Sequence, residues 1–529
     1  MRAPAIGRLR GATRLAVGAL AVTLVAACSS GSAAPPPPAA PPPAPTPSDR
    51  AGPAAFAVCD NQVAGPASPP AGAVVVDPAV DADLSAKTEA NPPGTTFWLA
   101  TGTHTLGTSE FGQVVPKDGN TYIGAPGAIL DGRGVNRYAF TQQAENVTIK
   151  HLTVQGFEAP RNEGVVNHDS GNGWVIEHNT IQNNGGAGMM AGARQVIRHN
   201  CLRDNGQYGI NAYQADDGIT DLVVERNEIA GNNTDNWELR TPGCGCTGGV
   251  KFWAVNGADV RGNWIHDNRG AGLWADTNNN DFLIEGNLIE GNDSEAIFYE
   301  TSYNAIIRDN TIRNNAMVKG KRFADEGQRF PVAAIYLSEV GGEPLVPART
   351  DRIEIHGNVL ENNWSGITAW ENADRFCNSP ANTSGNDCTR LVPSIPQCSQ
   401  PGISQPPLYD HCRWKTQRLD IHDNTFRFDP EVVGCAGGRT GRMAILSNFG
   451  TYPDWSPYQG RVIQQSITFE QQNRWRSNSY QGPWTFVVFE NGRVLDATGW
   501  QAEPFGQDRG SEFTHSAGTG CAGDTEGGA

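Results

Sequence analysis

The chain of 529 residues lacks a long basic run beyond its first fifteen residues, and its formal net charge is −16. A basic stripe is the usual footprint of nucleic-acid binding, so we expect no nucleic-acid partner. The chain also lacks a Cys-x-x-Cys pair with a His pair nearby, which argues against a zinc site. We expect no cofactor. The sequence leaves open whether a structural calcium ion is bound, because Asp216 and Asp217 are either ordinary turn residues or calcium ligands of a lyase.

The N-terminus lacks an apolar run long enough for a comfortable membrane span. A positively charged start precedes the run LAVGALAVTLVAAC, which ends at Cys28. The end of this run resembles a bacterial lipobox, which implies a signal peptide over 1–28 and a lipid on Cys28. An ordinary signal peptide with a chance cysteine is the alternative. Residues 29–55 are rich in Pro and Ala and predict an extended tether. We therefore expect an exported protein, either secreted or anchored as a lipoprotein to the outer face of the bacterial cell membrane.

Ten further cysteines, an even number in an exported chain, favour disulfides. Four of them lie in one segment rich in Ser, Asn and Pro, where local bridges would staple a long loop: Cys377, Cys388, Cys398 and Cys412. Cys244 and Cys246 lie in a second insertion. The pairing itself cannot be read from the sequence.

Instead of helical periodicity, the chain carries a repeat. Segments such as WVIEHNTIQNN, FLIEGNLIEGN and AIIRDNTIRNN align on one asparagine, which recurs as Asn179, Asn200, Asn227, Asn263, Asn287, Asn310, Asn358 and Asn424. The steps are 21, 27, 36, 24, 23, 48 and 66 residues. We interpret 48 as two periods of about 23, and 36 and 66 as periods with cysteine-bearing insertions. Apolar residues alternate at period two on both sides of the asparagine, which predicts short strands.

Three short strands per period form one coil of a parallel β-solenoid, whose core closes only when coils stack. The asparagine suits a left-handed backbone position, and its side chain can hydrogen-bond to the asparagine of the next coil. With this repeat, the chain resembles the right-handed parallel β-helix superfamily of pectate lyases and their relatives. We therefore predict an all-β, single-stranded right-handed parallel β-helix with long loop insertions and end caps.

This prediction divides the chain into an N-terminal cap with the first coils at 56–145, a β-helix at 146–435, and terminal coils or a cap with a frayed tail at 436–529. Insertions are expected at 228–248, 316–332 and 372–416. We expect a monomer.

The strands that open successive coils predict an outward-facing site. When YGINAY, GVKFWAV, GLWADT, AIFYET, AIYLSE and GITAWE are aligned, their first aliphatic residues should point into the core. Two outward columns follow: Asn211, Lys251, Trp274, Phe298, Tyr336 and Thr368, then Tyr213, Trp253, Asp276, Glu300, Ser338 and Trp370. Asp276 and Glu300 therefore lie one coil apart. Adjacent strands are about 4.8 Å apart, close to the carboxyl separation of a retaining glycosidase.

Repulsion between two such carboxyls should raise one pKa, so that a protonated acid lies beside a carboxylate. The aromatic residues of the column suit the faces of sugar rings, and Lys251 could hold a hydroxyl or a substrate carboxylate. The predicted substrate contacts are Lys251, Trp253, Trp274, Tyr213, Tyr299, Trp370 and Glu371.

The stretch from Gly249 to Asn304 also resembles the catalytic coils of β-helix glycoside hydrolases of the β-xylosidase kind. Their pattern has a Lys after a Gly-aliphatic start, an Asp closing a G-[IL]-W-x-D strand and a Glu on the next coil. The resemblance implies Asp276 as nucleophile and Glu300 as acid/base. It departs from the pattern at Thr277, where an aromatic residue is expected, and this leaves the sugar open.

Alternatives remain at this point. Asp276 and Glu300 are two acids among 56 and could be solvated turn residues, with Lys251 an ordinary ion-pair partner of Asp276 or Glu295. The tryptophans could pack under the insertions. The protein is predicted to be a retaining glycoside hydrolase acting on a polysaccharide or oligosaccharide. It could instead be a polysaccharide lyase with Lys251 as base, or a glycan-binding or cell-envelope protein without catalysis.

Overall fold

The computed structural model describes residues 52–80, 83–214, 218–241, 247–385, 387–489, 493–514 and 521. The predicted signal peptide with Cys28, and most of the tether, lie outside this part of the chain, as do Asp216, Asp217, Cys244 and Cys246.

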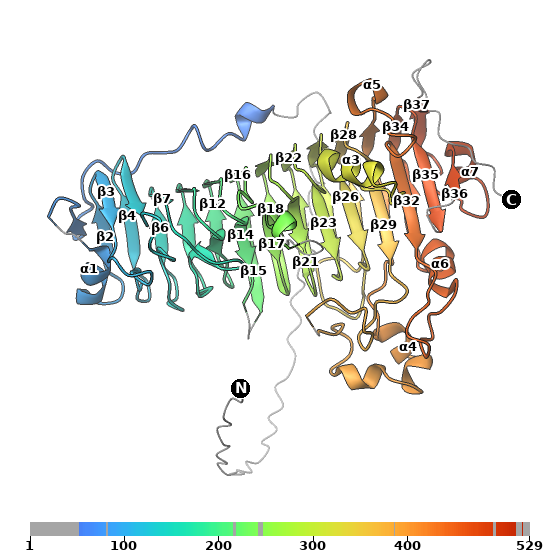
Figure 1. Ribbon diagram of the computed structural model, residues 1–529, viewed down its shortest axis with the longest axis horizontal. Coiled ribbons are helices and arrows are strands. Elements are labelled where there is room, and N and C mark those ends of the chain that lie inside the picture. Colours follow the sequence, from blue (N-terminus) through green and yellow to red (C-terminus); the bar gives the residue numbers. More distant parts are fainter. Residues whose placement is uncertain are drawn as a thin grey trace, which may run out of the picture. The chain divides into compact units, whose positions relative to one another are not determined.

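The described residues form three stacked sheets whose strands pair in parallel from coil to coil (Figure 1). The first sheet contains β1 (Val74–Val76), β2 (Thr96–Leu99), β4 (Thr121–Gly124), β6 (Thr148–Lys150), β9 (Val175–Glu177), β12 (Val196–Arg198), β15 (Ile219–Glu225), β18 (Val255–Arg261), β21 (Asn280–Glu285), β24 (Ala305–Arg308), β27 (Ile353–His356), β30 (Leu419–His422) and β33 (Arg474–Arg476). The second contains β3 (Gly102–Thr105), β5 (Ala128–Asp131), β7 (Thr153–Gln155), β10 (Thr180–Gln182), β13 (Cys201–Arg203), β16 (Glu228–Ala230), β19 (Trp264–His266), β22 (Leu288–Glu290), β25 (Thr311–Arg313), β28 (Val359–Glu361), β31 (Thr425–Arg427), β34 (Ser479–Gln481) and β37 (Glu512–Thr514).

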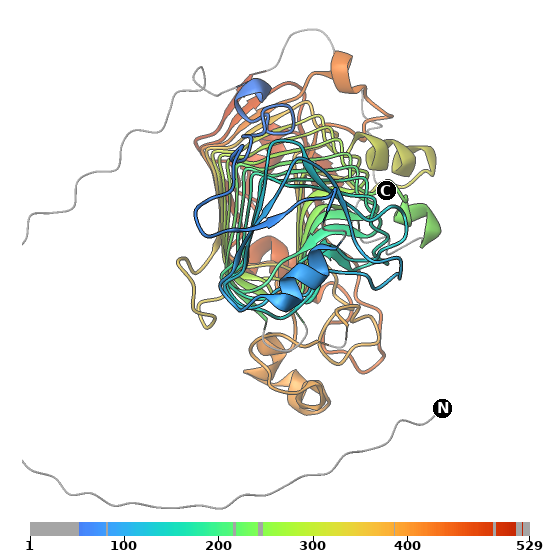
Figure 2. The same ribbon diagram turned by 90° about the vertical axis from the view of Figure 1, so that its left-hand side faces the viewer.

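The third sheet carries the outward columns. It contains β8 (Gly164–Val166), β11 (Ala187–Met190), β14 (Tyr208–Ala212), β17 (Gly248–Phe252), β20 (Ala271–Ala275), β23 (Ile297–Glu300), β26 (Ile335–Ser338), β29 (Ile367–Glu371), β32 (Arg442–Ser447), β35 (Thr485–Phe489) and β36 (Arg493–Leu495). Only the last pair, β35 with β36, is antiparallel among these strands. Figure 2 looks along the stack, where the successive coils superimpose. The predicted all-β parallel β-helix is confirmed.

Helices are short and lie in the connections: α1 (Leu84–Ala90), α2 (Trp237–Arg240), α3 (Met317–Asp325), α4 (Leu408–His411), α5 (Pro430–Val433), α6 (Val462–Gln465) and α7 (Ala497–Gln501). None of the helices in the described ranges has the length and hydropathy needed to cross a membrane. In Figure 1, α3 and the lobe that carries α4 lie on opposite sides of the face formed by β23, β26 and β29.

The core consists of the inward side chains of all three sheets. The six aliphatic residues predicted to point inward are all buried, with at most 1 % exposure: Ile210, Val250, Leu273, Ile297, Ile335 and Ile367. Stacking such residues over many coils removes a continuous apolar strip from water, which is the main stabilising contribution.

The repeated asparagines form a buried hydrogen-bonded ladder, as predicted. Asn287, for example, donates its backbone N–H and its side-chain amide to Oδ1 of Asn310, both at 2.9 Å. A second ladder, which the sequence alignment missed, runs five residues later through Asn184, Asn205, Asn232, Asn268, Asn292, Asn315 and Asn363. Because each amide bridges two coils, both ladders satisfy buried backbone groups at the corners between sheets.

Two details of the repeat prediction were wrong. The left-handed residue is the one before the asparagine, as at His199 with φ 54°, and not the asparagine itself. The step of 48 residues is one coil and not two, because Asn310 bonds directly to Asn358 and β24 pairs with β27. The extra length lies in the segment with α3 and in the loop at 339–352. The first insertion also begins later than expected, since β16 occupies 228–230.

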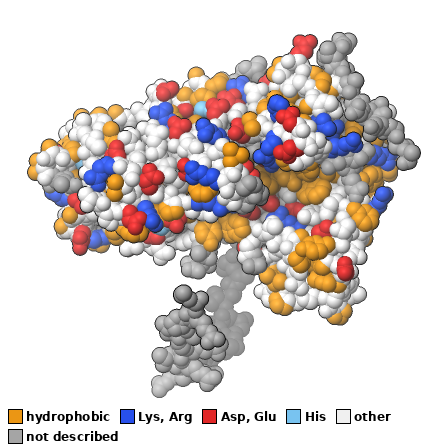
Figure 3. Space-filling view, viewed as in Figure 1, with side chains coloured by type: hydrophobic (Ala, Val, Ile, Leu, Met, Phe, Trp, Pro, Cys, Tyr) orange, Lys and Arg blue, Asp and Glu red, His pale blue; other side chains and the backbone are white. Residues whose placement is uncertain are grey.

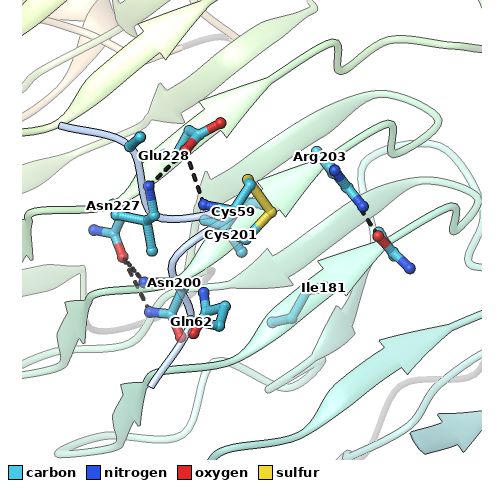
Figure 4. Close-up of a disulfide and its surroundings, with 12 residues drawn as sticks. Cys59, Gln62, Ile181, Asn200, Cys201, Arg203, Asn227 and Glu228 are labelled. Carbon is cyan, nitrogen blue, oxygen red and sulfur yellow. Dashed lines mark hydrogen bonds between the residues drawn. A yellow bond between two sulfur atoms is a disulfide. The ribbon is translucent and has the colours of Figure 1, made fainter. Parts of the chain in front are cut away.

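Four disulfides occur among the described cysteines. Cys377–Cys388 and Cys398–Cys412 staple the 372–416 insertion, as predicted, and Cys435–Cys521 joins the C-terminal segments. Cys59–Cys201 fastens an N-terminal segment onto β13, and Glu228 accepts hydrogen bonds from the backbone N–H groups of Val58 and Cys59 at 2.6 and 2.8 Å (Figure 4). The one group of potential metal-binding side chains in the described ranges is Cys377, Cys388 and Cys398, and all three sulfurs are in disulfides.

Candidate active site

The strand register aligns the first predicted outward column. Lys251 pairs with Asn211 on one side and Trp274 on the other, and Trp274 pairs with Phe298. The Trp274 and Phe298 rings stack with centroids 5.3 Å apart. Alternation along each strand therefore places these side chains on the outer face of the third sheet.

Asp276 and Glu300 occupy equivalent places on consecutive coils. The residues before them, Ala275 and Tyr299, are register partners in β20 and β23. Both acids line a cavity of about 760 Å³ together with Lys251, Trp253 and Trp274. The predicted pair is therefore brought together at one open site, between strands spaced about 4.8 Å apart.

Asp276 is held by one ion pair and two hydrogen bonds. Its Oδ2 is 3.0 Å from Nζ of Lys251, and its Oδ1 accepts hydrogen bonds from the backbone N–H and the hydroxyl of Thr277 at 2.7 and 3.0 Å. The Lys251 ammonium lies 4.2 Å from the centroid of the Trp274 ring, a cation–π contact. Thr277, which replaces the aromatic residue expected from the family pattern, thus holds the Asp276 carboxylate.

Glu300 lies in a different environment. Its Oε2 accepts a hydrogen bond from Nε1 of Trp274 at 3.1 Å, and its Oε1 is 2.6 Å from Nη1 of Arg375. Burial is the largest influence and raises the pKa of Glu300, and the negative charges of Asp276 and Glu339 act in the same direction against the opposing charge of Arg375. The two neighbouring carboxyls therefore lie in different environments, Asp276 beside Lys251 and Glu300 beside Arg375 and Trp274.

Arg375 was not predicted, although it bridges two acids. Its Nη1 also lies 3.3 Å from Oε2 of Glu339, whose own pKa is raised by burial. Glu339 also accepts a hydrogen bond from the backbone N–H of Asn372 at 2.8 Å. Arg375 belongs to the 372–416 insertion and has no counterpart in the repeat, so only the nearby cysteines hinted that this loop is held in a defined place.

The walls of the cavity come from insertions. Leu239 of α2 and Val318 of α3 line its rim and are 72 % and 57 % exposed. Lys319 of α3 pairs with Glu295 at 2.6 Å. Figure 3 shows hydrophobic side chains gathered between α3, whose surface carries charges of both signs, and the lobe below it.

Four predicted substrate contacts do not line this cavity. Tyr299 is fully buried and donates a hydrogen bond to the carbonyl of Tyr303 at 2.7 Å. Its neighbours Phe298 and Glu300 point outward, so Tyr299 points inward. The prediction of Tyr299 as a substrate contact was therefore wrong. Glu371 is also buried, and its carboxylate pairs with Arg413.

Trp370 packs edge-on against Phe330, with ring centroids 5.6 Å apart, as the packing alternative anticipated. Tyr213 is 43 % exposed and lines a neighbouring cavity, edge-on to Trp253.

The family comparison agrees with this architecture. Residues 131–274 and 164–383 match the family model described as the right handed beta helix region. This part of the chain is a right-handed parallel β-helix. The resemblance inferred from the asparagine repeat is thus confirmed for the fold.

Several solved structures are similar to the chain, at low identity. The A-module of the mannuronan C-5 epimerase AlgE4 of Azotobacter vinelandii is 13 % identical, with 68 % of this chain and 93 % of that one covered and a TM-score of 0.37. The catalytic unit of the GH87 α-1,3-glucanase of Streptomyces thermodiastaticus is 12 % identical, with 86 % and 70 % covered and a TM-score of 0.44. The periplasmic alginate epimerase AlgG, as a mutant, is 11 % identical, with 78 % and 83 % covered and a TM-score of 0.37. No curated protein matches the chain significantly.

Proposed function

We propose that the protein is a carbohydrate-active enzyme, a retaining glycoside hydrolase with Glu300 as acid/base and Asp276 as nucleophile. The observation that carries this proposal is the shared cavity in which the two carboxyls, one coil apart, have different environments. A retaining glycosidase needs one protonated and one ionised carboxyl about 5–5.5 Å apart.

In the first step, protonated Glu300 donates its proton to the glycosidic oxygen while the Asp276 carboxylate attacks the anomeric carbon. The bond to the leaving sugar breaks, and a glycosyl ester on Asp276 forms. In the second step, Glu300, now ionised, takes a proton from water, whose oxygen attacks the same carbon and releases Asp276. Burial raises the pKa of Glu300, which favours the acid form before the first step, and Lys251 holds the Asp276 carboxylate.

The lyase alternative has less support. A lyase base must be a neutral amine. Lys251 instead forms an ion pair with Asp276, with Nζ and Oδ2 3.0 Å apart, and a lysine in an ion pair is a cation. The stacked rings of Trp274 and Phe298, together with Lys251, also suit glycan binding without catalysis. The test below therefore also distinguishes an enzyme from a glycan-binding protein.

The test uses Asp276→Asn and Glu300→Gln with a panel of nitrophenyl and alkyl glycosides of pentoses and hexoses. The kcat/KM of Asp276→Asn should fall at least about 10³-fold on every substrate that the parent cleaves. The kcat/KM of Glu300→Gln should fall as much on alkyl glycosides. It should fall less on nitrophenyl glycosides, because their leaving groups need little protonation. The control is Glu285→Gln, since Glu285 lies on the first sheet and pairs with Arg308. Parental rates in both variants would overturn the assignment. Glycan binding without turnover in the parent would favour a binding protein.

We also propose that the protein is exported and carries a lipid on Cys28, which would tether the β-helix to the outer face of the membrane through residues 29–55. This rests on the lipobox-like sequence and the Pro/Ala-rich segment after it. Labelled fatty acid should enter the parent in the native host and not Cys28→Ser, which should move to the medium. Equal labelling of both proteins would contradict the anchor.

A further inference from the structure

A second cavity of about 980 Å³ adjoins the candidate active site. Lys251 and Trp253 line both cavities, so the two cavities meet at these side chains. The second cavity extends towards the preceding coil, where Tyr213 and Asn211 contribute to its lining. Together, the two neighbouring cavities offer much more space than the cavity around the two carboxyls alone.

Aromatic side chains follow one another along this depression. Tyr213, Trp253 and Asp276 occupy the same outward column on three consecutive coils, with Glu300 next. The ring centroids of Tyr213 and Trp253 are 6.5 Å apart, and Tyr213 is 43 % exposed although its ring carries a large apolar area. A partly exposed aromatic face in a cavity suits the apolar face of a sugar ring.

The lining of the second cavity includes a cation with spare donors, Arg390. Arg390, from the 372–416 insertion, donates from Nε to the carbonyl of Asn278 at 2.9 Å, and its Nη1 lies 3.4 Å from Oδ1 of Asn256. Within the described ranges, no carboxylate forms an ion pair with it. A guanidinium has five N–H donors, so others remain for hydroxyl or carboxylate oxygens of a ligand.

We propose that the second cavity holds the sugars on one side of the bond that is cleaved, with Tyr213 and Arg390 as substrate-positioning residues. The substrate is then a polymer or long oligosaccharide that lies along the coils and is cut internally, and not a short glycoside that is trimmed from its end. This inference rests on the proposed hydrolase function, because it assigns the bond-breaking point to Asp276 and Glu300.

The experiment compares Tyr213→Ala and Arg390→Ala with the parent on α-1,3-gluco-oligosaccharides, xylo-oligosaccharides and oligogalacturonides of two to eight sugars, and on a nitrophenyl glycoside. For the series that is cleaved, kcat/KM of the parent should rise at least about tenfold from dimer to hexamer. In each variant, kcat/KM should fall about tenfold on the hexamer and less than twofold on the nitrophenyl glycoside. On the polymer, viscosity should fall before many reducing ends appear.

Matched controls are Tyr452→Ala and Arg474→Ala, since Tyr452 is 44 % exposed and neither residue lines the two cavities. Equal losses on short and long substrates, or a parent that cleaves dimers as fast as hexamers, would overturn the inference.

The inference and the proposed function can fail separately. If the parent hydrolyses nothing, binding of the same oligosaccharides is measured by calorimetry. Affinity that increases with chain length and falls in Tyr213→Ala would then support the second cavity as a glycan site while the hydrolase assignment fails. Affinity without length dependence, or unchanged in both variants, would overturn the second-cavity inference.

Discussion

Nη1 of Arg375 lies 2.6 Å from Oε1 of Glu300, although 75 positions separate the two residues in the chain. The same nitrogen lies 3.3 Å from Glu339, so one guanidinium is shared by two buried carboxyls. Arg375 opposes the effect of burial on Glu300, whereas Glu339 reinforces it. The insertion that carries Arg375 therefore lowers the pKa of the proposed acid/base against the effect of burial.

The pH dependence of hydrolysis should follow this network. The pKa of Glu300 is raised, so the acid form persists to higher pH, and activity should fall as pH rises through that raised value. Glu339→Gln removes a charge that raises the pKa of Glu300, and should move the alkaline limb of kcat/KM to lower pH. Arg375→Gln removes the opposing charge and should move it to higher pH. A shift of both variants in the same direction would contradict this account.

Lys251→Met should slow hydrolysis without abolishing it. The variant keeps the length of the side chain near Trp274 but removes the ammonium from Asp276, so we expect a loss of about 10- to 100-fold in kcat/KM. Absorbance of unsaturated uronate products is measured in parallel on pectate and alginate. If the parent forms such products and Lys251→Met does not, the lyase function would replace the hydrolase function.

The disulfide that closes the loop directly after Arg375 should matter for the site as well as for stability. Cys377 and Cys388 are 11 positions apart, and removing both as alanines should lower the free energy of unfolding of this region by about 2–4 kcal/mol. Ser384 within this loop accepts a hydrogen bond from Nη2 of Arg375 at 3.2 Å. Loosening the loop should therefore also move the alkaline limb of kcat/KM to higher pH, as in Arg375→Gln.

The matched control is the double variant Cys59→Ala and Cys201→Ala, whose disulfide fastens the N-terminal segment away from both cavities. It should change stability and leave the pH profile unchanged. A shifted profile in this control would show that the effect is not specific to the Arg375 loop.

The asparagine ladder should be a stability element. Asn287 accepts from Asn263 and donates to Asn310 and to the carbonyl of Val260, all within the core. Asn287→Ala leaves several buried groups without partners, so we expect a loss of about 1–3 kcal/mol or more in chemical unfolding. The control Asn61→Ala removes an exposed amide that bonds to Ala57 and should change stability by less than about 0.5 kcal/mol. Equal effects of the two variants would contradict the ladder's role.

Much of the site follows from local alternation. The strands GVKFWAV, GLWADT and AIFYET have one inward aliphatic residue each, and the next outward positions then include Lys251, Trp274, Asp276 and Glu300. The same rule, applied to Tyr299, places it in the core, so that error was avoidable from the sequence. The second asparagine ladder was also readable, since Asn184 and its equivalents recur five residues after the first.

What the sequence by itself determined is the strand period, the inward and outward faces and the one-coil spacing of Asp276 and Glu300. These depend on side-chain alternation and on one repeated residue type, which are local properties. Only the tertiary structure decided that Arg375 meets Glu300, that Glu371 pairs with Arg413 and that Arg390 reaches the second cavity. The 372–416 insertion has no period. Its position depends on buried ion pairs and disulfides between residues far apart in the chain, and no local pattern encodes such contacts.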